Sequence, residues 1–130
     1  MNPAEPNGPS AKLTEAIIGA AIDVHRELGP GLLESAYDAC LAHELTNRGI
    51  AFERQVVLPL VYKGQRVDCG YRLDFLVQDE VVIETKACDQ LAPIHEAQLL
   101  TYLRLSRKRV GLLINFNERV LKSGIRRRVL

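Results

Sequence analysis

The sequence predicts an α/β fold in three layers, a mixed sheet of four to five strands flanked by helices. Three observations carry this prediction. Two N-terminal segments repeat apolar residues at helical spacing. Residues 81–83, at the start of the segment 81–87, and most of residues 109–116 are apolar at consecutive positions, which is typical of strands covered on both faces. A helical segment separates these two strands, and a strand–helix–strand unit makes them parallel.

The composition indicates one domain over residues 12–130, because 130 residues with 47% hydrophobic side chains can bury a single core. Residues 1–11 are rich in Pro, Asn and Gly and predict a flexible N-terminal tail. Three cysteines without paired spacing fit a reducing compartment and argue against a disulfide framework or a zinc cluster. With no signal peptide and no membrane span, we expect a cytoplasmic protein without a membrane partner.

Two helices are expected first. Residues 13–28 form one, which ends at Gly29-Pro30-Gly31 because glycine permits a left-handed cap and proline cannot continue the helix. Residues 33–48 form the second, with Gly49 just past its end. Glu34 lies in its first turn, where the helix dipole favours a carboxylate.

Three strands are expected next. Residues 52–62 form the first, and Pro59 within it indicates an edge strand or a bulge, since proline cannot donate to the ladder. After a Lys63-Gly64 turn, residues 66–77 form the second strand, with a bend at Cys69-Gly70. Residues 81–87 form the third, which we expect at the centre of the sheet.

A third helix is expected over residues 93–105, with Pro93 at its first position. Apolar residues surround it almost entirely, so we expect it to be largely buried. Residues 109–116 form the next strand, and residues 125–130 form a short last strand with Arg126 and Arg128 on one face.

The hairpin of the second and third strands carries charges that a buried sheet should lack. If its loop is residues 78–80, Asp74 lies opposite Glu84, and Lys86 shares the face of Glu84. Opposed carboxylates repel, and a divalent cation with its preference for carboxylate oxygens would offset the repulsion. A two-residue turn would instead shift the register by one residue, and Asp74 would then lie opposite a residue whose side chain points to the other face of the sheet.

Asp74 followed by Glu84-Thr85-Lys86 resembles the D…(D/E)xK signature of the PD-(D/E)xK nuclease superfamily. The helix that follows carries Gln98-x-x-x-Tyr102, similar to the QxxxY motif of the exonuclease-like branch, and a helical Glu34 precedes the sheet as in many members. The resemblance implies a restriction-endonuclease-like core.

A closer resemblance covers residues 14–130. Residues 29–37 (GPGLLESAY) resemble the namesake motif of the GxxExxY proteins, small bacterial and archaeal proteins placed in that superfamily, and residues 93–100 and 111–116 are also similar to that family. Leu73 stands where the superfamily name has Pro, and Thr85 stands where an apolar residue is commoner. Neither departure removes a catalytic group.

The resemblance implies a centre for Mg²⁺ or Mn²⁺ and a set of catalytic residues. The implied metal ligands are Asp74, Glu84, the main-chain carbonyl of Thr85 and Glu34. Lys86 would stabilise developing negative charge rather than act as a free base, and Gln98 and Tyr102 would orient the water or the phosphate.

Charge is unevenly distributed along the chain. Residues 1–100 carry 8 Lys/Arg against 15 Asp/Glu, and residues 101–130 carry 9 against 1. A basic C-terminal part can hold a polyanion, although a solvated basic face is the plainer alternative. The candidate phosphate contacts are Lys108, Arg109, Arg126 and Arg128.

A metal-dependent nuclease acting on nucleic acid, with DNA favoured over RNA and a homodimer as one option, is therefore the first functional hypothesis. A non-catalytic nucleic-acid or protein-binding module is the second, and an enzyme acting on a small nucleotide is the third.

Each residue also has a structural alternative: a surface ion pair for Glu84 and Lys86, a dipole role for Glu34, and polar helix tips for Gln98 and Tyr102. His25 and His95 are expected to be structural neighbours of the site. Sparse aromatic residues, 5% without tryptophan, argue against a surface that stacks many bases.

Overall fold

The computed structural model describes residues 8–130; residues 1–7 of the expected N-terminal tail lie outside that range. The elements in chain order are α1 (Ala11–Leu28), α2 (Glu34–Asn47), β1 (Phe52–Val57), β2 (Leu60–Tyr62), β3 (Gln65–Val67), β4 (Arg72–Val77), β5 (Val81–Lys86), α3 (Pro93–Ser106), β6 (Val110–Asn115), the 3-10 helix η1 (Leu121–Gly124) and β7 (Ile125–Val129).

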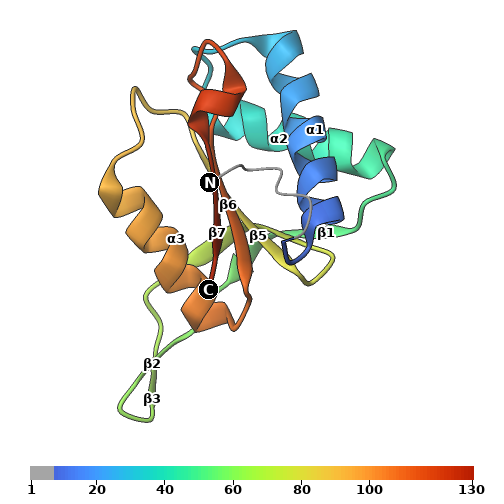
Figure 1. Cartoon of the computed structure of the whole chain (residues 1–130). Coiled ribbons are helices and arrows are strands. Elements are labelled where there is room, and N and C mark those ends of the chain that lie inside the picture. The colour runs from blue at the N-terminus through green and yellow to red at the C-terminus, as the bar shows by residue number, and fades with distance from the viewer. Residues whose placement is uncertain (1–7) are drawn as a thin grey trace.

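Five strands form one mixed sheet in the order β1-β4-β5-β6-β7. β5 and β6 are parallel, and the other neighbouring pairs are antiparallel. α1 and α2 lie on one side of the sheet and α3 on the other (Figure 1). The three-layer α/β fold is confirmed, together with the parallel pair around α3, the edge position of β1 and the central position of β5.

Two apolar clusters fill the space between helices and sheet, because side chains alternate across the central strands. On the side of α1 and α2 the cluster includes Ile83 and Leu112, and on the side of α3 it includes Val82 and Leu113. All four side chains are fully buried. Burial on both faces explains why these strands are continuously apolar in sequence.

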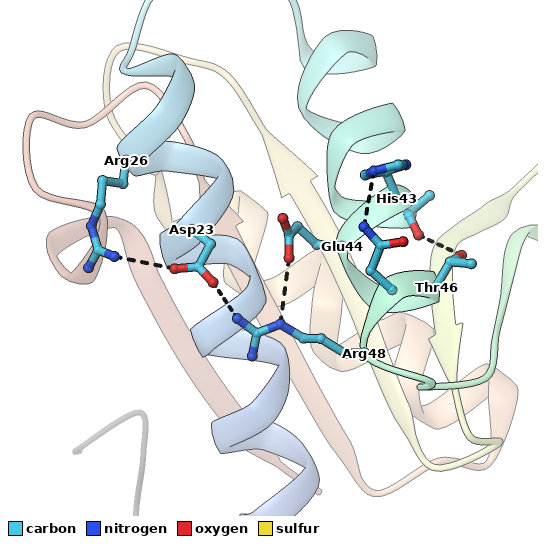
Figure 2. A network of polar contacts seen from close by, with 8 residues as sticks. Asp23, Arg26, His43, Glu44, Thr46 and Arg48 are labelled. Carbon is cyan, nitrogen blue, oxygen red and sulfur yellow. Dashed lines mark hydrogen bonds and ion pairs between the residues drawn. The ribbon is translucent and has the colours of Figure 1, made fainter.

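Polar contacts also join α1 to the end of α2. Arg48 pairs with Asp23 of α1 and lies 3.6 Å, from Nε to Oε2, from Glu44 of α2, while Asp23 also pairs with Arg26 (Figure 2). Exposed ion pairs contribute only about 0–1 kcal/mol each. Most of the α1–α2 stability therefore comes from the buried apolar stripes of the two helices.

The expected strands 52–62 and 66–77 are each broken in two. The chain leaves the sheet at Leu58-Pro59 and returns at Tyr71, where the Leu58 N–H donates to the Tyr71 carbonyl at 2.8 Å. Between them β2 and β3 pair only with each other, and this hairpin projects from the body of the molecule (Figure 1). The missing N–H of Pro59 and the bend at Gly70, with φ of 72°, end the regular ladder.

The third helix is buried on one face only, so the expectation of a largely buried helix is wrong. Leu99, Tyr102 and Leu103 face the sheet, whereas Ile94 is 69% exposed. The sheet buries one side of α3, and Leu60 and Tyr71 at the base of the β2–β3 hairpin lie beside it without burying Ile94.

The described end of the expected tail contacts the body. Ser10 donates to Oε2 of Glu80 at 3.1 Å, and Arg127 of β7 donates to the Pro9 carbonyl. Helix α1 begins at Ala11. Among residues 8–130, no helix has the length and hydropathy needed to cross a membrane.

Candidate metal centre and active site

The β4–β5 hairpin has the register expected for a three-residue loop. Its backbone pairs are Phe75–Ile83, Leu76–Val82 and Val77–Val81. The ladder stops before Asp74 and Glu84, so these two residues do not form the regular cross-strand pair that the sequence suggested. β5 nevertheless continues to pair with β6 as far as Lys86. The two strands β4 and β5 therefore separate at the position of the carboxylates.

Side-chain carboxylates take the place of the missing backbone pairs. The Asp74 N–H donates to Oε2 of Glu84 at 2.8 Å, and the Thr85 N–H donates to Oδ2 of Asp74 at 2.9 Å. Each carboxylate thus accepts from the backbone of the opposite strand. Such charge-assisted bonds are stronger than neutral ones and offset the repulsion between the two acids.

Helix α2 brings two more carboxylates to the same place. Glu34 and Asp38 are one helical turn apart, so both project from one side of α2. Glu34 is exposed, whereas Asp38 is only 6% exposed. One carboxylate oxygen each from Glu34, Asp38 and Asp74 lie within 4.8 Å of one another. We call this set the acidic cluster.

Asp38 was missed in the sequence, where Glu34 alone was considered on this helix. The available signal was its position four residues after Glu34 and directly after the buried Tyr37. A carboxylate beside a core position needs a partner, and Asp38 has one in the Thr85 hydroxyl. That partner lies 47 residues away, so no local pattern could identify it.

Thr85 joins the two halves of the acidic cluster. Its hydroxyl donates to Asp38 and lies 3.2 Å from Oδ2 of Asp74, while its N–H bonds the same Asp74 oxygen. The side chain is fully buried. The sequence assigned a role only to the carbonyl of Thr85, whereas the structure shows its N–H and hydroxyl positioning acids from α2 and β4.

The acidic cluster fits a hard divalent cation. Its donors are all carboxylate oxygens, which Mg²⁺ and Mn²⁺ prefer over nitrogen or sulfur. Glu84, expected as a ligand, lies outside the set and bonds the Asp74 backbone instead. The acids that the structure brings within reach of one cation are thus Glu34, Asp38 and Asp74.

Burial and mutual repulsion raise the pKa values of these acids. Burial, then the Asp74 charge, raises the pKa of Glu84 to about 8, against the Asp74 N–H bond and the Lys86 charge. Burial also raises the pKa of Asp38, against the Thr85 bond, and burial followed by Asp74 raises that of Glu34. A bound cation would favour the ionised forms and reverse these shifts.

Lys86 supplies positive charge beside the acids. It follows Thr85 at the end of β5, is half-buried, and forms no ion pair with any described residue. Its charge lowers the pKa values of both Glu84 and Glu34. Lys86 therefore lies close enough to act on the site while keeping its ammonium group available.

Gln98 and Tyr102 approach from α3 on the opposite side of the sheet from α2. Tyr102 is 7% exposed, and burial followed by the Glu84 charge raises its pKa, against a hydrogen bond with Gln98. The structure thus brings together the acids of α2, β4 and β5 with Lys86, Gln98 and Tyr102.

The four candidate phosphate contacts fall into two separate places. Arg126 and Arg128 lie on β7 and pair with Glu96 of α3, at 3.4 Å and 2.8 Å. In the sheet, Leu113 of β6 pairs with Glu84 of β5 on one side and with Arg126 of β7 on the other. The backbones of Arg126 and Glu84 are therefore two strand spacings apart, or about 10 Å. Lys108 pairs with Asp79 at 2.9 Å, and together with Arg109 it lies at the opposite end of the sheet.

Both histidines have structural partners. Nε2 of His25 donates to the Glu118 carbonyl at 2.6 Å, and Nδ1 of His95 accepts the Ala92 N–H at 3.0 Å at the start of α3. These contacts anchor the loop after β6 and the start of α3.

Comparison with known proteins adds the family. A sequence model of the PD-(D/E)XK nuclease superfamily matches residues 11–128. No curated protein and no solved structure matches the chain. The match spans every described element from α1 to β7, and the mixed five-stranded sheet flanked by helices is the restriction-endonuclease-like fold of that superfamily. With its acidic cluster beside Lys86, this chain belongs to the PD-(D/E)XK nuclease superfamily.

Proposed function

We propose that the protein is a Mg²⁺- or Mn²⁺-dependent nuclease that hydrolyses phosphodiester bonds, and that it belongs to the GxxExxY group of its superfamily. The observation that carries the proposal is the convergence of Glu34, Asp38 and Asp74 beside Lys86 in a chain that matches the nuclease family. The motif that resembles the GxxExxY proteins contains Glu34, a member of this convergence.

The acidic cluster holds the cation in this proposal, and Glu84 fixes the backbone that presents Asp74. A bound divalent ion lowers the pKa of a coordinated water and stabilises charge on phosphate. Thr85 positions Asp38 and Asp74 from the same point, which sets the spacing of the ligands. The carbonyl of Thr85 remains a proposed additional ligand.

Lys86 stabilises negative charge on the phosphate in this proposal. Its ammonium group forms no ion pair with any described residue and is available to a phosphate oxygen. Gln98 and Tyr102 orient the phosphate or the water from the α3 side. Arg126 and Arg128 lie on the same side and would contact phosphate by exchanging Glu96 for it.

The proposed substrate is nucleic acid, with DNA favoured, and the proposed location is the cytoplasm. A homodimer is part of the proposal only as a means of handling two strands. Lys108 and Arg109 would contact only a substrate that extends to the far end of the sheet.

The test is cleavage of labelled single-stranded, duplex and branched DNA and of RNA with Mn²⁺, Mg²⁺ or EDTA. We expect cation-dependent products that fall at least 100-fold in Asp74→Asn and in Lys86→Ala, since each removes a group acting on the reacting phosphate. Glu53→Gln, an exposed carboxylate on β1, is the matched control and should retain activity.

Cleavage that survives the double variant Asp74→Asn/Lys86→Ala would overturn the proposal. Retention on nucleic acid without turnover under every cation condition would instead support a binding module.

A further inference from the structure

A pocket lies between α3 and the base of the β2–β3 hairpin, and it shares Gln98 and Tyr102 with the candidate site. It is a pocket of about 310 Å³, which we call the hairpin pocket, and its lining residues are Leu60, Tyr71, Ile94, Ala97, Gln98, Thr101, Tyr102 and Leu105. The α3 members recur every three to four positions, so they form one stripe along the helix beside Leu60 and Tyr71. The stripe runs from the first turn of α3 to the last.

The hairpin pocket is built for a flat apolar group. Tyr71 is 42% exposed, and its ring lies 6.0 Å from that of Tyr102, centroid to centroid, at an interplanar angle of 56°. The exposed face of Tyr71 and the side chain of Ile94 leave apolar surface open on either side of the pocket. The Gln98 amide adds a donor and an acceptor to a mostly apolar lining.

The hairpin pocket is continuous with the candidate site. Gln98 and Tyr102 line the pocket and are also the two α3 residues proposed at the reacting phosphate. Tyr102 also packs in one apolar cluster with Leu73, which precedes Asp74 in β4, and with Val82, two residues before Glu84 in β5. A group in the pocket is therefore separated from a phosphate in the site only by the side chains of Gln98 and Tyr102.

The charge around the hairpin pocket suits a polyanion, whereas the acidic cluster does not. The hairpin and the start of β4 carry three cations, Lys63, Arg66 and Arg72, against one carboxylate, Asp68. Arg66 and Arg72 are exposed and form no ion pair with any described residue. By contrast, Arg126, Arg128 and Lys108 are already paired with carboxylates.

We propose that the hairpin pocket binds one unpaired nucleobase of the strand whose phosphate enters the site, with Tyr71 as the stacking surface. The substrate class is then nucleic acid with unpaired nucleotides at the point of cleavage. A base inside a duplex has both faces stacked and its Watson–Crick edge paired, so only a single-stranded or extruded base can enter such a pocket. One pocket with one exposed ring also agrees with the low aromatic content. The inference rests on the proposed nuclease function.

The experiment is an abasic scan. Single-stranded oligonucleotides, each lacking the base at one position, are tested for binding by fluorescence anisotropy in EDTA at low salt and for cleavage in Mn²⁺. We expect one position to lose about 5- to 150-fold in affinity, the range for one base–aromatic stack. Tyr71→Ala should abolish the difference between intact and abasic strands at that position.

Two further variants keep the result interpretable. Tyr62→Ala removes the other exposed tyrosine of the hairpin, outside the pocket, and should preserve the position-specific loss. Ile94→Glu places a carboxylate at the pocket rim on an exposed position and should weaken binding as Tyr71→Ala does, with an unchanged unfolding midpoint.

Equal losses at every abasic position, or a position-specific loss that persists in Tyr71→Ala, would overturn the inference. So would a homodimer that Ile94→Glu dissociates while the scan is unchanged, because the stripe would then be a self-association surface. Cleavage without base dependence would overturn the inference and leave the nuclease function standing. Tyr71-dependent binding without cleavage would overturn the nuclease function and leave the base-binding pocket standing.

Discussion

At the scale of single residues, the Thr85 hydroxyl is the contact on which the acidic cluster depends. It bonds Asp38 and reaches Asp74, so one buried side chain links carboxylates from α2 and β4. A hydroxyl carries one hydrogen and donates to one acid at a time. Its bond to Asp38 also opposes the burial that raises the pKa of that carboxyl.

Thr85→Val keeps the shape of the side chain and removes the hydroxyl. We expect a loss of about 1–3 kcal/mol in the free energy of unfolding, because buried Asp38 is left without its donor. Mn²⁺ binding should weaken as well. Thr46→Val is the control, since its exposed hydroxyl bonds only its own helix and should change stability by less than about 0.5 kcal/mol. Urea unfolding measures the stability of both variants, and equal unfolding midpoints for Thr85→Val and Thr46→Val would contradict the prediction.

Glu84 makes stability depend on pH. Its pKa is about 8 in the folded protein and 4.5 when unperturbed, so between those values the folded state binds more protons than the unfolded state. The contribution of Glu84 to the free energy of unfolding is therefore at its full value below about pH 4.5, and it is lost as the pH rises towards 8.

Glu84→Gln keeps an acceptor for the Asp74 N–H and removes this titration. In EDTA we expect the variant to match the wild type near pH 4 and to exceed it by up to a few kcal/mol at pH 8. Urea unfolding across that range measures the difference. A stability difference between Glu84→Gln and the wild type that stays constant with pH would contradict the raised pKa of Glu84.

At the scale of elements, the packing of α3 on β6 positions one wall of the site. Gly111 of β6 lies under α3, and a Cβ there would be 2.8 Å from Cδ1 of Leu99. The missing side chain of Gly111 therefore lets α3, which carries Gln98 and Tyr102, pack closely on β6.

Gly111→Ala should destabilise the fold by about 1–3 kcal/mol, because the added methyl group must displace Leu99 and with it α3. Gly19→Ala is the control, since it adds a methyl group within helix α1 and improves helix propensity there. Thermal unfolding compares the two. If cleavage is observed, it should fall in Gly111→Ala and remain in Gly19→Ala; equal stability of the two variants would contradict the packing argument.

At the scale of the whole molecule, the site is acidic and the cations lie around it. The Lys63 and Arg66 side chains on the projecting hairpin are exposed, whereas Lys108 is paired with Asp79 at the far end of the sheet. Nucleic-acid affinity driven by phosphate contacts falls with salt in proportion to the number of contacts.

Lys63→Ala/Arg66→Ala should weaken binding uniformly across sequences and reduce the slope of log affinity against log salt by about 2. The comparison pair is Lys108→Ala/Arg109→Ala, which removes the same charge from the opposite end of the sheet. Anisotropy titrations at several salt concentrations measure both slopes. An unchanged slope in the hairpin variant would show that the strand does not pass over this hairpin.

Much of the fold follows from local pattern. The helical stripes, the two continuously apolar strands and the unit 81–116 identify three layers and a parallel pair, and the three-residue loop sets the register of Phe75 on Ile83. The loop cannot show where the ladder stops, because the separation at Asp74 depends on side chains that replace backbone partners.

Periodicity and loop length act between near neighbours, so the layer order and the spacing of Asp74, Glu84 and Lys86 can be derived from the sequence alone. Three features become visible only in the folded chain: Asp38 joins the acidic cluster, the hairpin of β2 and β3 leaves the sheet, and one face of α3 stays open beside Tyr71. Each of these depends on residues far apart in the chain, whose meeting is set by packing rather than by any local preference.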